Sequence, residues 1–80
     1  MKLQEAIAKR IEYYCDDRGL TLNKLCTMSG VVQSTVHGIF TGKSMKPQVE
    51  TIYNLCIGLQ IPISEFFNSP LFDEANIQTD

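Results

Sequence analysis

The sequence has no tryptophan, only one histidine and no long apolar run among its 80 residues. A membrane-spanning helix needs about 18 apolar residues in succession, and no stretch of this chain comes close to that. The first residues alternate positive and negative charges, which is not the pattern of a signal peptide. We therefore expect a cytoplasmic protein with no membrane partner. The length is that of one small domain, so we expect no sensing domain and no small-molecule ligand.

The chain has too few reactive residues in suitable patterns for catalysis. Its three cysteines, Cys15, Cys26 and Cys56, match no metal knuckle and no CxxC motif. Each lies at an apolar helical position, where cysteine behaves as a small hydrophobic residue, so reduced thiols are the simplest interpretation. A zinc site made of these cysteines and His37 is the alternative. Because there is also no nucleophile–base spacing and no phosphate-binding glycine loop, we expect no enzyme, no metal and no cofactor.

The net charge of −2 argues against a uniformly basic nucleic-acid-binding domain, but the charges are unevenly distributed. Residues 1–19 carry four basic and four acidic side chains, which sum to zero. Residues 20–47 carry three lysines and no acid (+3), and residues 48–80 carry five acids and no base (−5). This asymmetry indicates a polyanionic partner for the middle of the chain. The alternative is that these three lysines are ordinary solvated surface residues with no polyanionic partner.

Apolar periodicity predicts five short helices around one core and no strand. The predicted helices cover residues 3–18, 22–29, 33–41, 48–59 and 62–67, with Thr21 as the N-cap of the second. Residues 1–68 form the predicted domain, and residues 69–80 are an acidic tail that we expect to be frayed or docked on a partner. The side chains predicted to point inward, besides the cysteines, are Leu3, Ile7, Ile11, Tyr14, Leu22, Leu25, Val32, Val36, Ile39, Phe40, Val49, Ile52, Tyr53, Leu55, Leu59, Ile63, Phe66 and Phe67.

The second and third predicted helices are joined by a glycine-containing turn, which is the pattern of a helix-turn-helix unit. In such a unit the second helix enters the major groove of DNA, and its N-terminal residues meet base edges. With Val36 and its apolar neighbours inward, the opposite face of helix 33–41 is small, polar and free of acids. Gln33 can pair with adenine through its amide. The lysines at 43 and 46 can hold phosphates.

The run Gly30–Lys43 (GVVQSTVHGIFTGK) resembles the phage repressor and Cro class of helix-turn-helix regulators, the xenobiotic-response-element family. Arg18–Thr21, Val49–Ile52 and Leu59–Phe67 resemble the family's flanking segments, so the resemblance extends from Ile7 to Phe67. It implies a lambda-repressor-like fold and a sequence-specific, dimeric transcriptional regulator, in which we expect a repressor on a palindromic double-stranded DNA operator. A protein-interaction module of antitoxin or antirepressor type is the alternative. The implied base contacts are Gln33, Ser34, His37 and Gly38, and the implied phosphate contacts are Thr21, Asn23, Thr41, Lys43, Ser44 and Lys46.

The sequence departs from the family pattern at several positions. Gly38 stands where the family usually has a long polar side chain, so one base contact is lost there. Cys15 and Phe40 stand where the family tends to hold a buried arginine and glutamate, and we predict that an apolar contact replaces the ion pair. Ile57 lies off the predicted apolar stripe of its helix. Exposed apolar patches mark partner surfaces, so we expect a homodimer interface formed by Ile57, Leu71 and Phe72.

Overall fold

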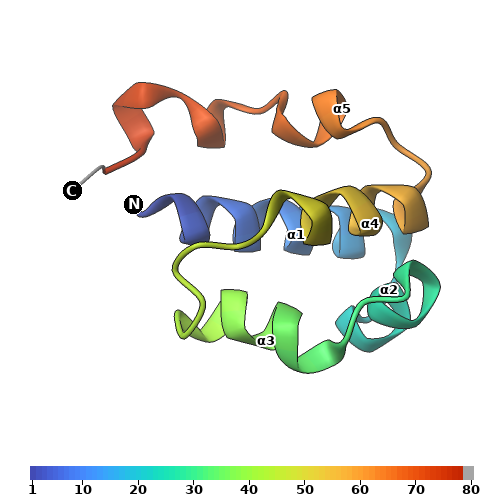
Figure 1. Ribbon diagram of the computed structural model, residues 1–80. Coiled ribbons are helices and arrows are strands. Elements are labelled where there is room, and N and C mark those ends of the chain that lie inside the picture. Colours follow the sequence, from blue (N-terminus) through green and yellow to red (C-terminus); the bar gives the residue numbers. More distant parts are fainter. Residues whose placement is uncertain (79–80) are drawn as a thin grey trace.

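The computed structural model describes residues 1–78, and these residues fold into five α-helices followed by two short 3-10 helices (Figure 1). The described residues contain no sheet, only an isolated bridge between Lys2 and Gln78. The all-α fold class predicted from the sequence is confirmed. The elements are α1 (Leu3–Arg18), α2 (Leu22–Ser29), α3 (Gln33–Thr41), α4 (Val49–Leu59), α5 (Ile63–Phe67), η1 (Pro70–Phe72) and η2 (Glu74–Asn76).

The helices begin and end at local signals in the sequence. Thr21 caps α2, because its Oγ1 accepts a hydrogen bond from the Lys24 backbone N–H at 3.0 Å. Gly30 ends α2 with a φ of 68°, a left-handed conformation that glycine adopts without strain. The fourth and fifth helices begin one residue later than predicted, because Gln48 and Pro62 have extended backbone conformations and act as N-cap residues.

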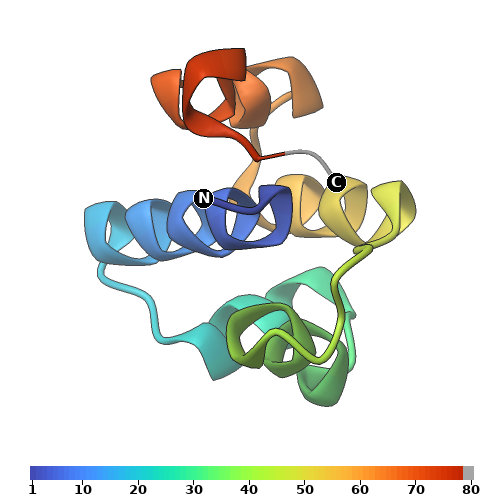
Figure 2. The same ribbon diagram turned by 90° about the vertical axis from the view of Figure 1, so that its left-hand side faces the viewer.

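The helices are arranged in three layers (Figures 1 and 2). The long helix α1 and α4 form the middle layer. The pair α2 and α3 lies on one side of it, and α5 with η1 and η2 lies on the other. The helix-turn-helix unit and the acidic C-terminal segment are therefore on opposite sides of the molecule.

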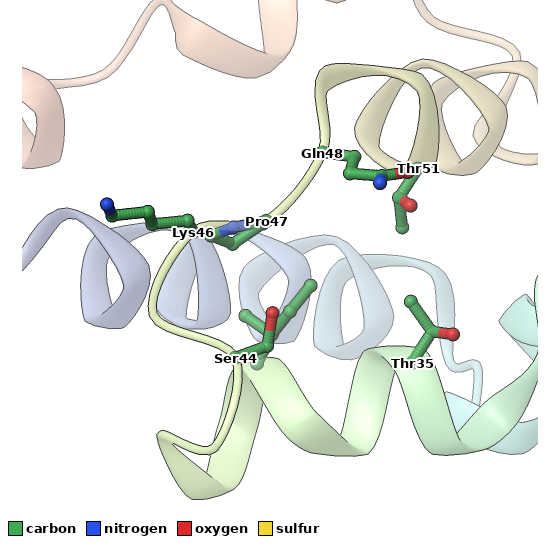
Figure 3. A pocket seen from close by; sticks show the side chains of 7 residues that line it. Thr35, Ser44, Lys46, Pro47, Gln48 and Thr51 are labelled. Carbon is green, nitrogen blue, oxygen red and sulfur yellow. The ribbon is translucent and has the colours of Figure 1, made fainter.

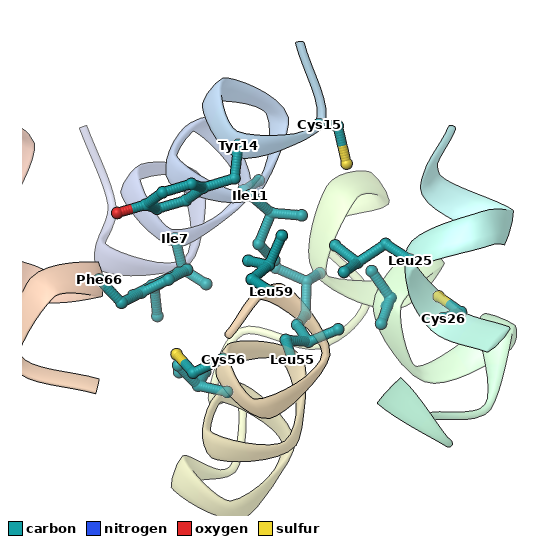
Figure 4. Close-up of a cluster of buried hydrophobic side chains, with 14 residues drawn as sticks. Ile7, Ile11, Tyr14, Cys15, Leu25, Cys26, Leu55, Cys56, Leu59 and Phe66 are labelled. Atoms are coloured by element: carbon teal, nitrogen blue, oxygen red, sulfur yellow. The ribbon is translucent and has the colours of Figure 1, made fainter. Parts of the chain in front are cut away.

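The core fills the space between these layers (Figure 4). Ile11 of α1, Leu25 of α2, and Leu55 and Leu59 of α4 are almost completely buried within it. All three cysteines are free thiols in the same cluster, and burial raises their pKa values above the ordinary value. Cys15 belongs to this cluster and Phe40 packs against it, while a direct contact between the two stays a prediction.

Some side chains predicted to point inward are exposed instead. They lie mainly at helix ends, where fewer neighbouring elements cover the surface than at helix centres. The correction applies to Leu3, Val32, Val49, Tyr53 and Phe67. Tyr14, by contrast, is buried as predicted, while its neighbour Tyr13 is half exposed.

Hydrogen bonds from Arg10 fasten α5 to α1. The Arg10 Nε donates to the Phe66 carbonyl at 2.7 Å, and its Nη2 donates to the Glu65 carbonyl at 2.8 Å and to the Tyr14 hydroxyl at 3.1 Å. The Tyr14 hydroxyl donates in turn to Glu65 Oε2 at 2.8 Å. Burial, followed by this hydrogen bond, raises the pKa of Tyr14. A single arginine thus satisfies carbonyls at the end of a five-residue helix that is too short to be stable alone.

The C-terminal segment up to Gln78, which was expected to be frayed or docked on a partner, packs against its own chain. The Phe72 ring lies 4.9 Å from the Phe67 ring and 6.1 Å from the Phe66 ring, measured between centroids. The Gln78 backbone N–H donates to the Met1 carbonyl at 2.7 Å, and the Met1 amino group donates to the Asn76 carbonyl at 2.9 Å. Aromatic packing and these backbone hydrogen bonds hold the segment against the first helix of its own chain.

Candidate nucleic-acid interface

The helix-turn-helix unit presents α3 on the surface of the molecule. Leu25 and Cys26 anchor α2 in the core, and Val36 and Ile39 anchor α3. The Gln4 side-chain amide of α1 donates to the Ile39 carbonyl and fixes the C-terminal end of α3. Because both helices are anchored on the side that faces the core, the opposite face of α3 is exposed to solvent.

Three predicted base-contact residues lie together at the N-terminal half of α3. Gln33, Ser34 and His37 are all exposed. Gln33 and His37 are four residues apart, so they are neighbours on one face of the helix. The amide, hydroxyl and imidazole groups offer both donors and acceptors of hydrogen bonds, which is what readout of base edges requires.

The fourth predicted base-contact residue, Gly38, is in a different position. It is half-buried, and the loop after α3 folds back onto it, because the Ser44 N–H donates to the Gly38 carbonyl at 3.0 Å. A Cβ atom placed on Gly38 would lie 3.4 Å from the Ser44 Cβ. The position that was expected to lie open on the outer face is thus partly covered by Ser44.

Val32, immediately before α3, is exposed although it was expected to point inward. It is 67% exposed and serves as the N-cap of the helix with an extended backbone. A valine cannot accept a capping hydrogen bond, and an apolar N-cap is about 1 kcal/mol less favourable than serine or threonine. Sequence periodicity misplaced this residue because the α3 stripe was extended one turn beyond the helix.

The predicted phosphate-contact residues lie at the start of α2 and at the end of α3 and beyond. Thr21 and Asn23 at the start of α2 are exposed, as are Thr41 at the end of α3 and Lys43 and Lys46 in the following loop. Ser44 is half-buried against Gly38. The structure therefore leaves most of these polar groups accessible to a ligand.

A surface cavity of about 290 Å³ lies between α3, the following loop and the start of α4 (Figure 3). Ser44 and Lys46 line it together with three polar residues that the sequence reasoning missed, Thr35, Gln48 and Thr51. The N-terminal N–H groups of α4 also lie in this region, because Gln48 and Thr51 line the cavity. Gln48 provides no side-chain cap for these groups. The signal available in the sequence was the cluster of polar residues on both sides of Pro47.

The charges of the unit differ in sign from those of the opposite layer. Residues 20–47 carry three lysines and no acid, whereas Asp73 and Glu74 lie beyond α5 on the other side of the middle layer (Figure 2). Phosphates approaching α3 therefore meet no acidic side chain of its own unit. Within residues 1–78, no group of three or more His, Cys, Asp or Glu side chains is placed to hold a metal ion. No helix of the same residues is long and apolar enough to cross a membrane.

Most of the chain, including the helix-turn-helix unit, matches the model of a known family. A family model described as the Cro/C1-type helix-turn-helix DNA-binding domain matches residues 10–70. The chain belongs to the Cro/C1-type family.

A solved structure resembles this Cro/C1-type domain closely. It is described as the crystal structure of the prophage Lp1 protein 11, and it superposes with a TM-score of 0.83 at 33% sequence identity. The alignment covers 92% of this chain and 99% of the other. No curated protein sequence gives a significant match. The phage repressor and Cro resemblance seen in the sequence is thus confirmed.

The residues expected to form a dimer interface in this Cro/C1-type domain have different environments. Ile57 is 56% exposed on α4, one turn from the exposed Tyr53. Leu71 and Phe72 are half-buried, and Phe72 packs against its own core. An interface at these residues stays a prediction, with Ile57 as its most accessible apolar side chain.

Proposed function

We propose that this protein is a non-catalytic, cytoplasmic repressor that binds a specific double-stranded DNA sequence and reads the major groove with α3. The observation that carries the proposal is the exposed N-terminal half of α3, where Gln33, Ser34 and His37 stand together on an acid-free surface. Lys43 and Lys46, both exposed in the loop after α3, hold phosphates. Gly38 has no side chain to offer a base and its carbonyl already accepts the Ser44 N–H, so the proposal relies on the other three residues.

The proposed molecule acts as a homodimer on a palindromic operator. Ile57 and Tyr53 supply exposed apolar surface on α4 for the second copy. A twofold dimer places its two α3 helices in half-sites about 34 Å apart, one turn of DNA. Sedimentation velocity at tens of micromolar tests this, with Ile57→Lys expected to sediment as a monomer. A wild-type protein that remains monomeric at that concentration refutes the dimer.

Selection of bound sequences from a random DNA pool tests the function as a whole. An enriched inverted repeat supports the proposal, and a pool with no enriched sequence overturns it. Two variants then separate the roles of the residues. Gln33→Ala is expected to relax the preference at one base pair, and Lys43→Ala to weaken binding to all sequences and lower the salt slope by about 1.

Lys9→Ala provides the matched control for Lys43→Ala, because Lys9 is an exposed lysine of α1 outside residues 20–47. Its binding is expected to follow the wild-type salt dependence. If DNA retention changes neither with salt concentration nor in the Lys43→Ala variant, the result favours the alternative, an interaction module that binds another protein.

A further inference from the structure

The most informative unexplained side chain near α3 is Val32. Its neighbours before and after in the chain have clear positions, since Val31 packs against the core and Gln33 begins the exposed face of α3. Val32 is 67% exposed between them. A single exposed apolar residue is ordinary on a protein surface, but this one is at the tip of the helix that is proposed to enter the major groove.

The turn between α2 and α3 determines where Val32 points. Gly30 reverses the chain, and the Val31 N–H donates to the Cys26 carbonyl at 3.1 Å. Val32 then has an extended backbone, with φ of −65° and ψ of 131°. Val31 packs against the core while Val32 is exposed, so the turn directs these two side chains to different sides.

The surroundings of Val32 permit a close approach by a ligand. Gly30 and Ser34, both exposed, are small, and Gln33 is the adjacent residue with base-pairing ability. The N-terminal end of a recognition helix is the part that meets base edges. A valine there offers methyl groups and no hydrogen bond, and the C5-methyl group of thymine is the apolar feature of the major groove.

We propose that Val32 is a specificity-determining residue that contacts the C5-methyl group of a thymine beside the base pair read by Gln33. The inference rests on the proposed DNA-binding function and adds a preference that Gln33 alone does not supply. It also accounts for an apolar N-cap on α3, where serine or threonine would satisfy the helix better.

Uracil substitution tests the contact, because uracil differs from thymine only by this methyl group. Each thymine of the selected site is replaced by uracil in turn, and the affinities of wild type and Val32→Ala are measured. Wild type is expected to lose about fourfold in affinity at one position per half-site, the effect of removing one buried methyl. Val32→Ala is expected to bind the thymine site about fourfold more weakly and to show no further loss at that uracil.

Val49→Ala is the matched control, since Val49 is 69% exposed at the start of α4. It is expected to keep the wild-type sensitivity to uracil. Val32→Thr provides a second variant that preserves the side-chain shape, and circular dichroism verifies that each variant is folded.

The outcomes separate this inference from the proposed function. An enriched sequence whose thymines all tolerate uracil overturns the Val32 contact while sequence-specific binding stands. Undiminished uracil sensitivity in a folded Val32→Ala variant overturns it as well. A random pool without any enriched sequence overturns both.

Discussion

Gly58 on α4 faces Ser29 at the end of α2, and replacing it with alanine tests how closely these helices pack. A Cβ atom on Gly58 would lie 2.1 Å from the Ser29 Oγ, 3.1 Å from its Cβ and 3.2 Å from its Cα. Rotation of the hydroxyl relieves the first overlap. The other two distances are below the roughly 3.5–4.0 Å that carbon atoms prefer, so α2 and α4 must move apart.

The expected effect is the difference between two opposing terms. Overpacking of a core contact costs about 1–3 kcal/mol. Replacing glycine by alanine within a helix contributes about 1 kcal/mol of stability in return. We therefore expect Gly58→Ala to lower the free energy of unfolding by about 1 kcal/mol, which lowers the melting temperature by about 4–8 °C in a domain of this size.

Urea unfolding followed by circular dichroism measures this change, and Gly38→Ala is its matched control. At Gly38 the nearest atom to an added Cβ is 3.4 Å away, close to ordinary contact, so helix propensity dominates and alanine is expected to stabilise. Ser29→Ala is expected to reduce the Gly58→Ala penalty in the double variant. An unfolding free energy of Gly58→Ala equal to or above that of wild type would refute the close approach of α2 and α4.

Three further predictions concern the anchoring of α5, the start of α2 and the effect of pH. Arg10→Met is expected to destabilise the domain by about 2 kcal/mol in urea unfolding, because the carbonyls of α5 lose their charged donor; an unchanged midpoint would contradict this. Thr21→Ala removes the cap of α2 and is expected to cost about 1 kcal/mol, whereas Thr21→Ser retains stability; equal losses would exclude capping. The native pKa values of Tyr14 and the thiols are raised, so the unfolded chain releases these protons first and stability falls as pH rises above about 9. Tyr14→Phe is expected to flatten this decline in melts between pH 8 and 11, and an identical slope would count against the assignment.

The sequence was sufficient to predict the helices because its local signals agree with one another. Apolar periodicity, the Thr21 cap and the glycine after α2 all indicate the same boundaries, and the structure confirms them. The exposed polar face of α3 also followed, since the inward positions of Val36 and Ile39 determine which side chains lie opposite.

Other features depend on contacts between distant residues and could not be predicted from local patterns. Arg10 is an ordinary charged position of α1 in the sequence, yet it binds carbonyls more than 50 residues away. The docking of residues 69–78 depends in the same way on contacts of Phe72 with the rings of α5 and of Gln78 with Met1. The predicted start of α3 at residue 33 was correct, but the apolar stripe was extended to Val32, which lies outside the helix and is exposed.

The separation of the basic helix-turn-helix unit from the acidic layer gives the domain an electric dipole through its middle layer (Figure 1). A polyanion attracts one end of such a molecule and repels the other, so its field exerts a torque as well as a force. For the proposed DNA binding, this torque is expected to turn the domain so that α3 faces the DNA before contact forms. Its total charge of −2 gives no net attraction to a polyanion, so orientation rather than accumulation is the main electrostatic effect. At an ionic strength of about 0.1 M or more the Debye length is about 10 Å or less, so the electrostatic torque is largely screened.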